Sequence, residues 1–364
     1  MDAPARIEHL ETQAFTIPTE EPESDGTAEW SATTLVLARL EAGGATGLGW
    51  TYGHECCATL LRKTLFPILR GRNAFDLPAL WRDMRAAVRN IGRRGAASCA
   101  MAAADLALWD LKARLLGVSI VKLLGVARKE IPIYGSGGFT SYSDEKLARQ
   151  LSGWAEDGIS MVKMKIGREP ERDAARVAVA RQAIGNEAQL FVDANGAYGA
   201  KQARRMARRF SEQRVDWFEE PVSSDDLAGL RFVREESAMD VAAGEYNYDT
   251  IEARRMLEAG AVDVLQADAT RCGVTGFLET AALCEAFGVP LSCHTAPAIH
   301  AHLGCVATRC RNVEYFFDHA RIEQALFEGA TTEHDSGVLR PDPEQPGFGL
   351  RFKDKDAAKF RIDV

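Results

Sequence analysis

Short apolar runs that end in an ionisable residue recur along the second half of the chain. Between Lys163 and Glu314 they are spaced about 25 residues apart, and they read MVKMKIG, LFVDAN, WFEEP, VAAGE, VLQAD, PLSCH and VEYFF. An apolar run of this length is typical of a buried parallel strand. The pattern therefore predicts successive strands that each carry an ionisable side chain at the C-terminal end.

The spacing of these runs matches one βα unit. A barrel strand takes about four to six residues, and its loops and the returning helix take the rest. An earlier apolar run begins at Ile131, so we expect a (β/α)7-8, TIM-like barrel over residues 131–325. Because active sites of such barrels form at the C-terminal strand ends, the ionisable groups should surround one mouth.

The first 130 residues follow another pattern. The segments IEHLETQAFTI, TTLVLARLEA and TGLGWTYG predict an antiparallel meander, and AASCAMAAADLALWDLKARLLG predicts a long helix that stops at Gly117. We therefore expect an α+β domain over residues 1–130. Residues 326–364 contain no further barrel unit, and we expect them to pack back on this first domain.

Composition and charge narrow the possible partners. The 364 residues are 46% hydrophobic and carry a formal charge of −8 without a charged tail, which argues against nucleic-acid binding. No apolar stretch reaches the roughly 18 residues of a membrane span, and the N-terminus lacks the order of a signal peptide. Eight cysteines without a CxxC pair suit a reducing compartment, so we expect a cytoplasmic protein.

Three carboxylates end consecutive predicted strands. Asp193, Glu219 and Glu245 are separated by 26 residues each, which places their oxygens side by side at the mouth. Any one of them alone would be read as an ion-pair partner or a helix cap. Three in register predict a site for a hard cation, and oxygen ligands of this kind suit Mg²⁺.

Two lysines precede the carboxylates by one unit. Lys163 and Lys165 are two residues apart on one strand, so both side chains point to the same face, here the barrel interior. Most such pairs lie on solvated edges. Mutual repulsion, partial burial and a nearby cation are expected to lower the pKa of one lysine towards neutrality, which would let it accept a proton.

The last predicted strands supply further candidates. Asp268 and His294 end neighbouring strands, so the carboxylate can orient the imidazole as an acid or base. Glu314 either stays protonated and donates a hydrogen bond to an oxyanion, or forms a salt bridge with a loop arginine. We interpret His300 and His302 as helix and core residues rather than metal ligands, because no soft ligand accompanies them.

The order KxK, D, E, E, D, H, E resembles the mandelate racemase subgroup of the enolase superfamily. The motifs VKMKIG, VDANGAY, WFEEPV, AGEYN, ADATRCG with VTG, and SCHTAPAIHAHL are similar to that subgroup's strand-end motifs. One departure is a single glycine, Gly273, where two usually precede VTG. We interpret it as a loop shortened by one residue, which puts the geometry between Asp268 and His294 in doubt.

The resemblance implies a capping domain at the N-terminus that closes over the barrel. It implies Mg²⁺ on the three carboxylates, bases at Lys165 and His294, and contacts from Lys163 and Glu314 to a substrate carboxylate. It also implies a homo-oligomer, often an octamer. The reaction would remove the proton next to a carboxylate and give an enediolate.

We expect dehydration of an acid sugar to a 2-keto-3-deoxy acid, because the polar segment PTEEPESDGTAEW, interpreted as a loop, suits a hydroxylated substrate. The alternative is a racemase or epimerase of a 2-hydroxy acid. Asn195, Tyr52 and Trp30 are the expected substrate contacts. A Schiff-base aldolase would use an interior lysine but needs no carboxylate triad, and a degenerate barrel that only binds an acid is the non-enzymatic alternative.

Overall fold

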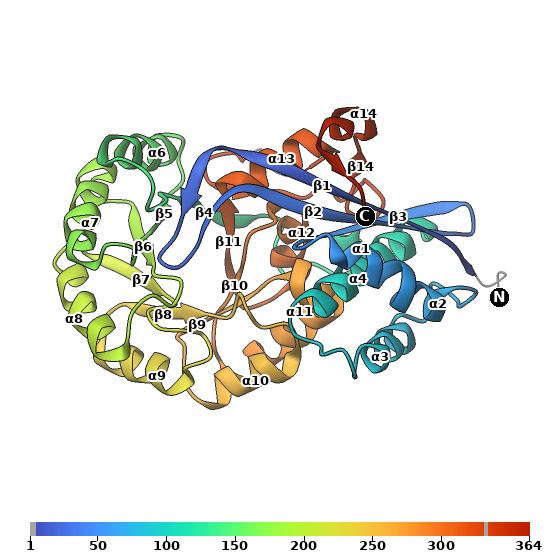
Figure 1. The fold of residues 1–364 in the computed structure, drawn as a ribbon, viewed down its shortest axis with the longest axis horizontal. Helices are drawn as coiled ribbons and strands as arrows, with labels where there is room; N and C mark the ends of the chain where they lie inside the picture. The colour runs from blue at the N-terminus through green and yellow to red at the C-terminus, as the bar shows by residue number, and fades with distance from the viewer. Residues whose placement is uncertain (1–4, 331–333) are drawn as a thin grey trace.

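The computed structural model describes residues 5–330 and 334–364, which form an antiparallel sheet domain beside a closed parallel barrel (Figure 1). The N-terminal sheet contains β1 (Ile7–Ser24), β2 (Glu29–Ala42) and β3 (Ala45–Tyr52), joined by tight connections. A short C-terminal strand, β15 (Arg361–Ile362), pairs with the outer edge of β1. The last residues of the chain therefore extend the N-terminal sheet.

The long helix predicted before Gly117 is α4 (Ala96–Leu115), which packs on the N-terminal sheet, and α3 (Leu77–Ala87) packs against α4. Its small residues allow a close approach to β3. A side chain at Gly47 would place its Cβ 2.1 Å from the carbonyl oxygen of Ala107. Alanines on one surface and glycines on the other are therefore what let this helix lie against the strand. Shorter elements connect these parts: α1 (Cys56–Leu60), a π-helix (Leu61–Leu65), α2 (Phe66–Leu69) and α5 (Ile120–Leu124).

The barrel has eight parallel strands, and the prediction of a barrel with seven or eight is confirmed. They are β4 (Ile131–Gly137), β5 (Met161–Lys165), β6 (Gln189–Asp193), β7 (Val215–Glu219), β8 (Asp240–Ala243), β9 (Val264–Ala267), β10 (Leu291–Cys293) and β11 (Cys310–Phe316). Each strand pairs with the next, and pairing of β11 with β4 closes the ring. This closure leaves no parallel edge exposed.

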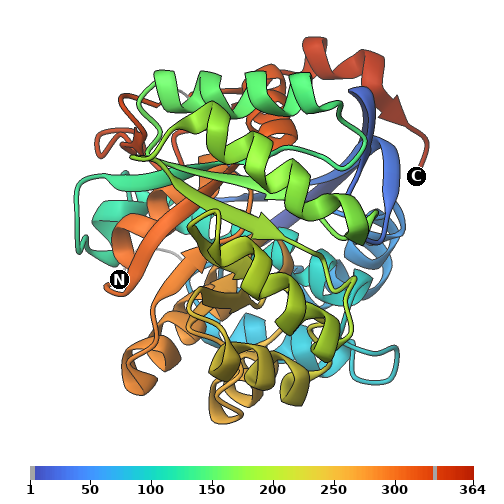
Figure 2. The same cartoon turned by 90° about the vertical axis from the view of Figure 1, so that its left-hand side faces the viewer.

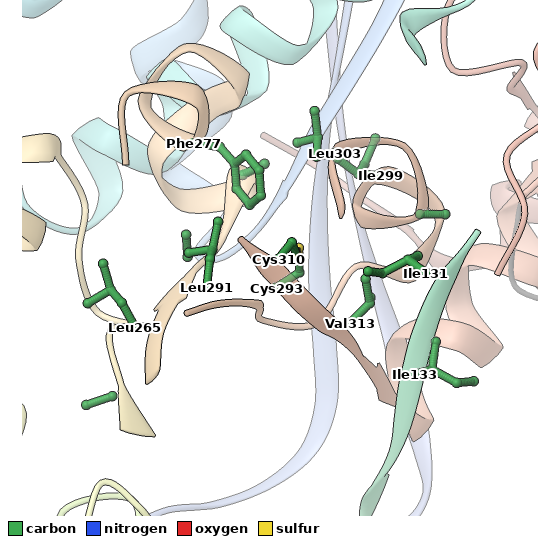
Figure 3. Close-up of a cluster of buried hydrophobic side chains, with 14 of the residues drawn as sticks. Ile131, Ile133, Leu265, Phe277, Leu291, Cys293, Ile299, Leu303, Cys310 and Val313 are labelled. Atoms are coloured by element: carbon green, nitrogen blue, oxygen red, sulfur yellow. The ribbon is translucent and has the colours of Figure 1, made fainter. Parts of the chain in front are cut away.

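Helices cover the outside of the barrel, as Figure 2 shows for residues 144–236. They are α6 (Asp144–Glu156), α7 (Pro170–Ile184), α8 (Ala200–Ser211), α9 (Leu227–Glu236), α10 (Thr250–Glu258), α11 (Ala269–Phe287), α12 (Pro297–Val306) and α13 (Phe317–Leu326). Figure 3 shows Phe277 of α11 beside Leu291 of β10, and Ile299 of α12 beside Leu303, all within one buried hydrophobic cluster. None of the helices in the described ranges is long and apolar enough to cross a membrane.

The segment after α13 continues with short strands. β12 (Phe327–Glu328) pairs with β14 (Arg351–Phe352), and β13 (Val338–Leu339) adds antiparallel to β4. A helical turn, α14 (Asp354–Ala357), and a 3-10 turn (Ala358–Phe360) lead to β15.

The segment from Pro18 to Trp30 was predicted to be a polar loop, and this prediction is wrong. Residues up to Ser24 belong to β1 and residues from Glu29 to β2, with a register shift between the pairs Pro18 with Ala32 and Glu23 with Trp30. The segment is thus an extended hairpin with an irregularity, and its tip lies at the barrel mouth (Figure 1). Its charged residues lack the alternation that would have predicted strands, although Glu23, Ser24 and Asp25 near its tip are buried.

Candidate active site

The three predicted carboxylates come together at the barrel mouth. Asp193 and Glu219 are paired across β6 and β7, while Glu245 follows β8 by two residues. All three are buried, and each offers an oxygen within 4.8 Å of the others. Such a cluster of like charges is costly without a cation between the groups. Its hard oxygen donors and its geometry fit Mg²⁺.

The two lysines are surrounded by these carboxylates. Lys163 Nζ lies 2.5 Å from Glu219 Oε1 and 2.8 Å from Glu314 Oε1, and Lys165 Nζ lies 2.5 Å from Asp193 Oδ2. Both side chains are buried in the barrel interior, as their spacing predicted.

The carboxylate charges act against the low lysine pKa that was expected with a cation nearby. Burial lowers the pKa of Lys165, but the charge of Asp193 outweighs burial and raises it above the ordinary value. The pKa of Lys163 is raised in the same way, because Glu219 and Glu314 outweigh its burial. Repulsion between the lysines is present but smaller than the attraction of the carboxylates.

His294 and Asp268 form the expected pair. His294 Nδ1 lies 2.9 Å from Asp268 Oδ2, and its other nitrogen, Nε2, lies 3.3 Å from Glu245 Oε2. Burial lowers the pKa of His294, yet the charges of Glu245 and Glu314 raise it to about 10. The doubt attached to the single glycine is therefore removed for this pair. Gly273 itself adopts a non-helical turn within α11, with φ of 74°.

Both predictions for Glu314 are wrong. Burial raises the pKa of this carboxyl, but Lys163 and then His294 outweigh burial and hold it below its usual range. Glu314 is therefore ionised, and its salt bridge is with Lys163 rather than a loop arginine. Ser136 Oγ and the backbone N–H of Thr295 donate to its oxygens at 2.6 and 3.1 Å.

The three residues expected to contact substrate lie in different surroundings. The Tyr52 hydroxyl donates to Glu323 Oε1 at 3.1 Å, and its ring stacks on His319. The Trp30 indole N–H donates to Glu23 Oε2 at 3.0 Å. Asn195 follows Asp193 at the mouth with φ of 46°, and its Oδ1 accepts no hydrogen bond within the described ranges. Of the three, Asn195 is the one with a free polar atom at the site.

The histidines of the HxH motif are buried core residues, as interpreted. The backbone N–H of Ala269 donates to His300 Nε2 at 3.0 Å, and His300 Nδ1 lies 2.7 Å from the carbonyl of Thr295. His302 packs edge-on against Phe348. Neither lies among the groups that could hold a metal in the described part of the chain.

Sequence reasoning missed two groups at this site. Arg271 donates from NH1 to the carbonyl of Glu245 at 2.6 Å and lies 3.6 Å from Asp268 Oδ2 through its Nε. Its position three residues after Asp268, in the first turn of a helix, was a readable signal. Glu220 is buried, and burial followed by the charge of Glu245 raises its pKa well above the ordinary value. It was hidden as the second glutamate of WFEEP.

Backbone strain also marks this mouth. Six described residues other than glycine have positive φ, and four of them lie one or two positions after strand-end groups of the site: Asn195, Glu220, Thr295 and Ala296. Such conformations cost of order 1–3 kcal/mol each, and they concentrate where a side chain must be held in place.

Comparison with known proteins shows which families and structures this chain resembles. Residues 12–125 match the mandelate racemase/muconate lactonizing enzyme N-terminal domain, and residues 146–357 match the enolase C-terminal domain-like family. A mandelate racemase/muconate lactonizing enzyme-like protein of Rubrobacter xylanophilus is 46% identical, with a TM-score of 0.95 over 98% of this chain and 100% of that one.

Two further relatives carry functional names. The 3,6-anhydro-alpha-L-galactonate cycloisomerase of Streptomyces coelicolor is 32% identical over 94% of this chain and 96% of its own. The L-talarate dehydratase of Polaromonas, solved with Mg and L-glucarate, is 30% identical, with a TM-score of 0.88 over 98% of both chains. The chain therefore belongs to the mandelate racemase/muconate lactonizing enzyme family of the enolase superfamily.

Proposed function

We propose that this chain is a Mg²⁺-dependent lyase that removes the proton next to a carboxylate and dehydrates an acid sugar to a 2-keto-3-deoxy sugar acid. The observation that carries the proposal is the placement of two proton-transfer groups at opposite ends of the carboxylate triad. Lys165 contacts Asp193, and His294 contacts Glu245. A substrate carboxylate held at the triad would have its α-carbon between them.

Each residue then has a role that its contacts support. Lys165 removes the α-proton, and His294, oriented by Asp268, protonates the departing 3-hydroxyl. Lys163, held by Glu219 and Glu314, neutralises charge on the substrate carboxylate. Asn195 is the candidate for binding a substrate hydroxyl. When bound to Asp193, Glu219 and Glu245, Mg²⁺ supplies charge that stabilises an enediolate and offsets the carboxylate charge that raises the pKa of Lys165.

Two observations keep isomerisation as the second candidate. The same pair of groups on two faces of one α-carbon would invert a centre, which is the racemase or epimerase reaction. The relative at 32% identity is a cycloisomerase, whereas the dehydratase reported above is 30% identical. The homo-oligomeric state and the cytoplasmic location stay predictions.

The test is a screen of sugar acids with Mg²⁺ that scores 2-keto-3-deoxy products and exchange of the C2 proton in D₂O. We expect product with the native enzyme, and a loss of at least about 10³-fold with Lys165→Ala and with His294→Asn. Exchange at C2 without any dehydration product would reject the lyase and favour the epimerase. Absence of both would reject the proposed chemistry.

A further inference from the structure

The barrel mouth has an aromatic side across from the carboxylate triad. In the closed ring, β4 and β11 meet each other on the side away from β7 and β8, where Glu219 and Glu245 stand. Phe316 is two residues beyond Glu314 on β11. Strand alternation therefore puts its ring on the same side as the Glu314 carboxylate, nearer the mouth.

Four rings contact one another in a row there, which we call the aromatic wall: Trp30, Phe139, Phe316 and His319. Phe139 is fully buried, so a ligand would meet the other three rings. The ring centroids of Phe316 and Phe139 are 5.8 Å apart, and those of Phe316 and His319 are 5.1 Å apart, both edge-on. Trp30 reaches down from the hairpin to Phe139, at 5.6 Å. The wall thus joins the barrel strands to the hairpin that lies over the mouth.

The aromatic wall carries no charge. Burial lowers the pKa of His319 to about 3, so its imidazole is neutral near pH 7. Trp30 has already given its indole N–H to Glu23. The faces and edges of these rings can pack against C–H groups. The neutral imidazole of His319 retains one N–H donor, but none of the four rings offers a positive charge to an anion.

Three cations near the hairpin are already paired. Arg168 lies 2.9 Å from Glu29, Lys146 contacts Glu21, and Arg321 lies 2.9 Å from Asp318. Their partners on the hairpin and on α13 leave no unpaired positive charge among these three.

Behind the aromatic wall lies a buried carboxyl pair. Glu23 of the hairpin and Asp318 of α13 are both fully buried, and neither Glu23 Oε1 nor Asp318 Oδ2 has a hydrogen-bond partner in the described part of the chain. Burial, with the charge of Asp318, raises the pKa of Glu23 to about 9. Glu23 therefore keeps its proton near pH 7, and Asp318 is paired with Arg321, so this cluster offers no unpaired cation to an anion at the wall.

We propose that the substrate is a monocarboxylic sugar acid whose uncharged far end lies against the aromatic wall, and that sugar diacids are excluded. This inference rests on the proposed function, because it assumes that the acid group is held at the triad. A second carboxylate would lose its water beside apolar rings without gaining a cation. The C–H faces of an uncharged sugar end would instead pack on the rings.

The direct test is binding, measured by titration calorimetry on full-length Lys165→Ala enzyme with Mg²⁺, so that turnover does not interfere. The ligands are matched pairs: D-gluconate against D-glucarate, and D-galactonate against galactarate. We expect at least one monoacid to bind tenfold or more tightly than its diacid. Equal or tighter binding of the diacids, or no binding by any monoacid, would overturn the inference.

A charge-gain variant sharpens the test. Phe316→Arg places a cation at the aromatic wall and should shift preference towards the diacid at least tenfold, while Phe316→Leu should keep the monoacid preference. Thermal unfolding of both variants shows whether they fold. If they do not, the titration of monoacids against diacids on Lys165→Ala enzyme still tests the inference. Monoacid binding without dehydration product or C2 exchange by the native enzyme would reject the proposed reaction but keep this inference.

Discussion

The hairpin that covers the mouth should be sensitive to one added methyl group at its tip. A Cβ on Gly26 would lie 2.4 Å from the carbonyl oxygen of Ala194 and 2.7 Å from that of Ile166. These backbone atoms directly follow Asp193 and Lys165, so they belong to the rigid ends of β6 and β5. They cannot move aside as a flexible side chain would. We therefore expect Gly26→Ala to displace the hairpin tip from the barrel.

The magnitude follows from the cost of overpacking. Inserting a methyl group into a packed contact costs about 1–3 kcal/mol, and a shift of about 1–3 kcal/mol between two states changes their ratio by about 5–150-fold. Because the hairpin tip moves as a local unit, this cost should reduce the docked population and hence kcat/KM by that factor. The midpoint of thermal unfolding should change little, since the barrel and the main sheet stay packed.

Two measurements check this expectation. One is kcat/KM on the best substrate of the screen, and the other is the rate of cleavage by a glutamate-specific protease at Glu20, Glu21, Glu23 and Glu29, which should rise. Gly153→Ala in α6 is the matched control, because its added methyl group meets no atom within 4 Å. If Gly26→Ala keeps both the native kcat/KM and the native cleavage rate, docking of the hairpin is not needed for function.

Three further outcomes are expected. Glu219→Gln removes one of three clustered carboxylates, so Mg²⁺ affinity measured by calorimetry should fall at least about tenfold; unchanged affinity would reject the triad as the metal site. Burial raises the pKa of Glu323 from 4.5 to about 8, so the folded state holds a proton that the unfolded chain releases. Stability from this group should therefore fall as pH rises from about 4.5 to about 8, and Glu323→Gln should flatten that slope in urea unfolding at pH 5, 7 and 9. Tyr52→Phe loses the hydroxyl bond to Glu323 and should cost about 1 kcal/mol of stability, with KM within twofold of native; a tenfold rise in KM would restore Tyr52 as a substrate contact.

The barrel and its ring of charged groups could be predicted because both depend on local sequence. A buried parallel strand needs a short apolar run, and a group at its C-terminal end must face the mouth. The pairing register confirms the consequence, since Lys165 stands opposite Asp193 and Asp193 opposite Glu219. Equal spacing in the chain therefore became adjacency in space.

The capping side of the site could not be predicted in this way. Trp30 packs on Phe139, and Tyr52 donates to Glu323, across 109 and 271 positions of the chain. No periodicity within either segment specifies such partners, because they depend on how the hairpin lies on the barrel. The tip of that hairpin is fixed by a glycine contact with backbone carbonyls, which leaves no hydrophobic signal in the sequence.

The pKa values of the two lysines show how the metal and the base depend on each other. The sequence prediction combined burial and a nearby cation with one repulsion, between Lys163 and Lys165, whose side chains leave one strand about 6–7 Å apart. The structure sets against it three contacts of Lys163 with carboxylates, at 2.5, 2.8 and 3.4 Å. At about 4 kcal/mol per unit-charge pair near 4 Å in a partly polarisable interior, attraction wins. Lys165, held by Asp193, can lose its proton near neutral pH only when another cation offsets that carboxylate charge. The prediction that Lys165 acts as a base therefore depends on the prediction that the triad binds a metal.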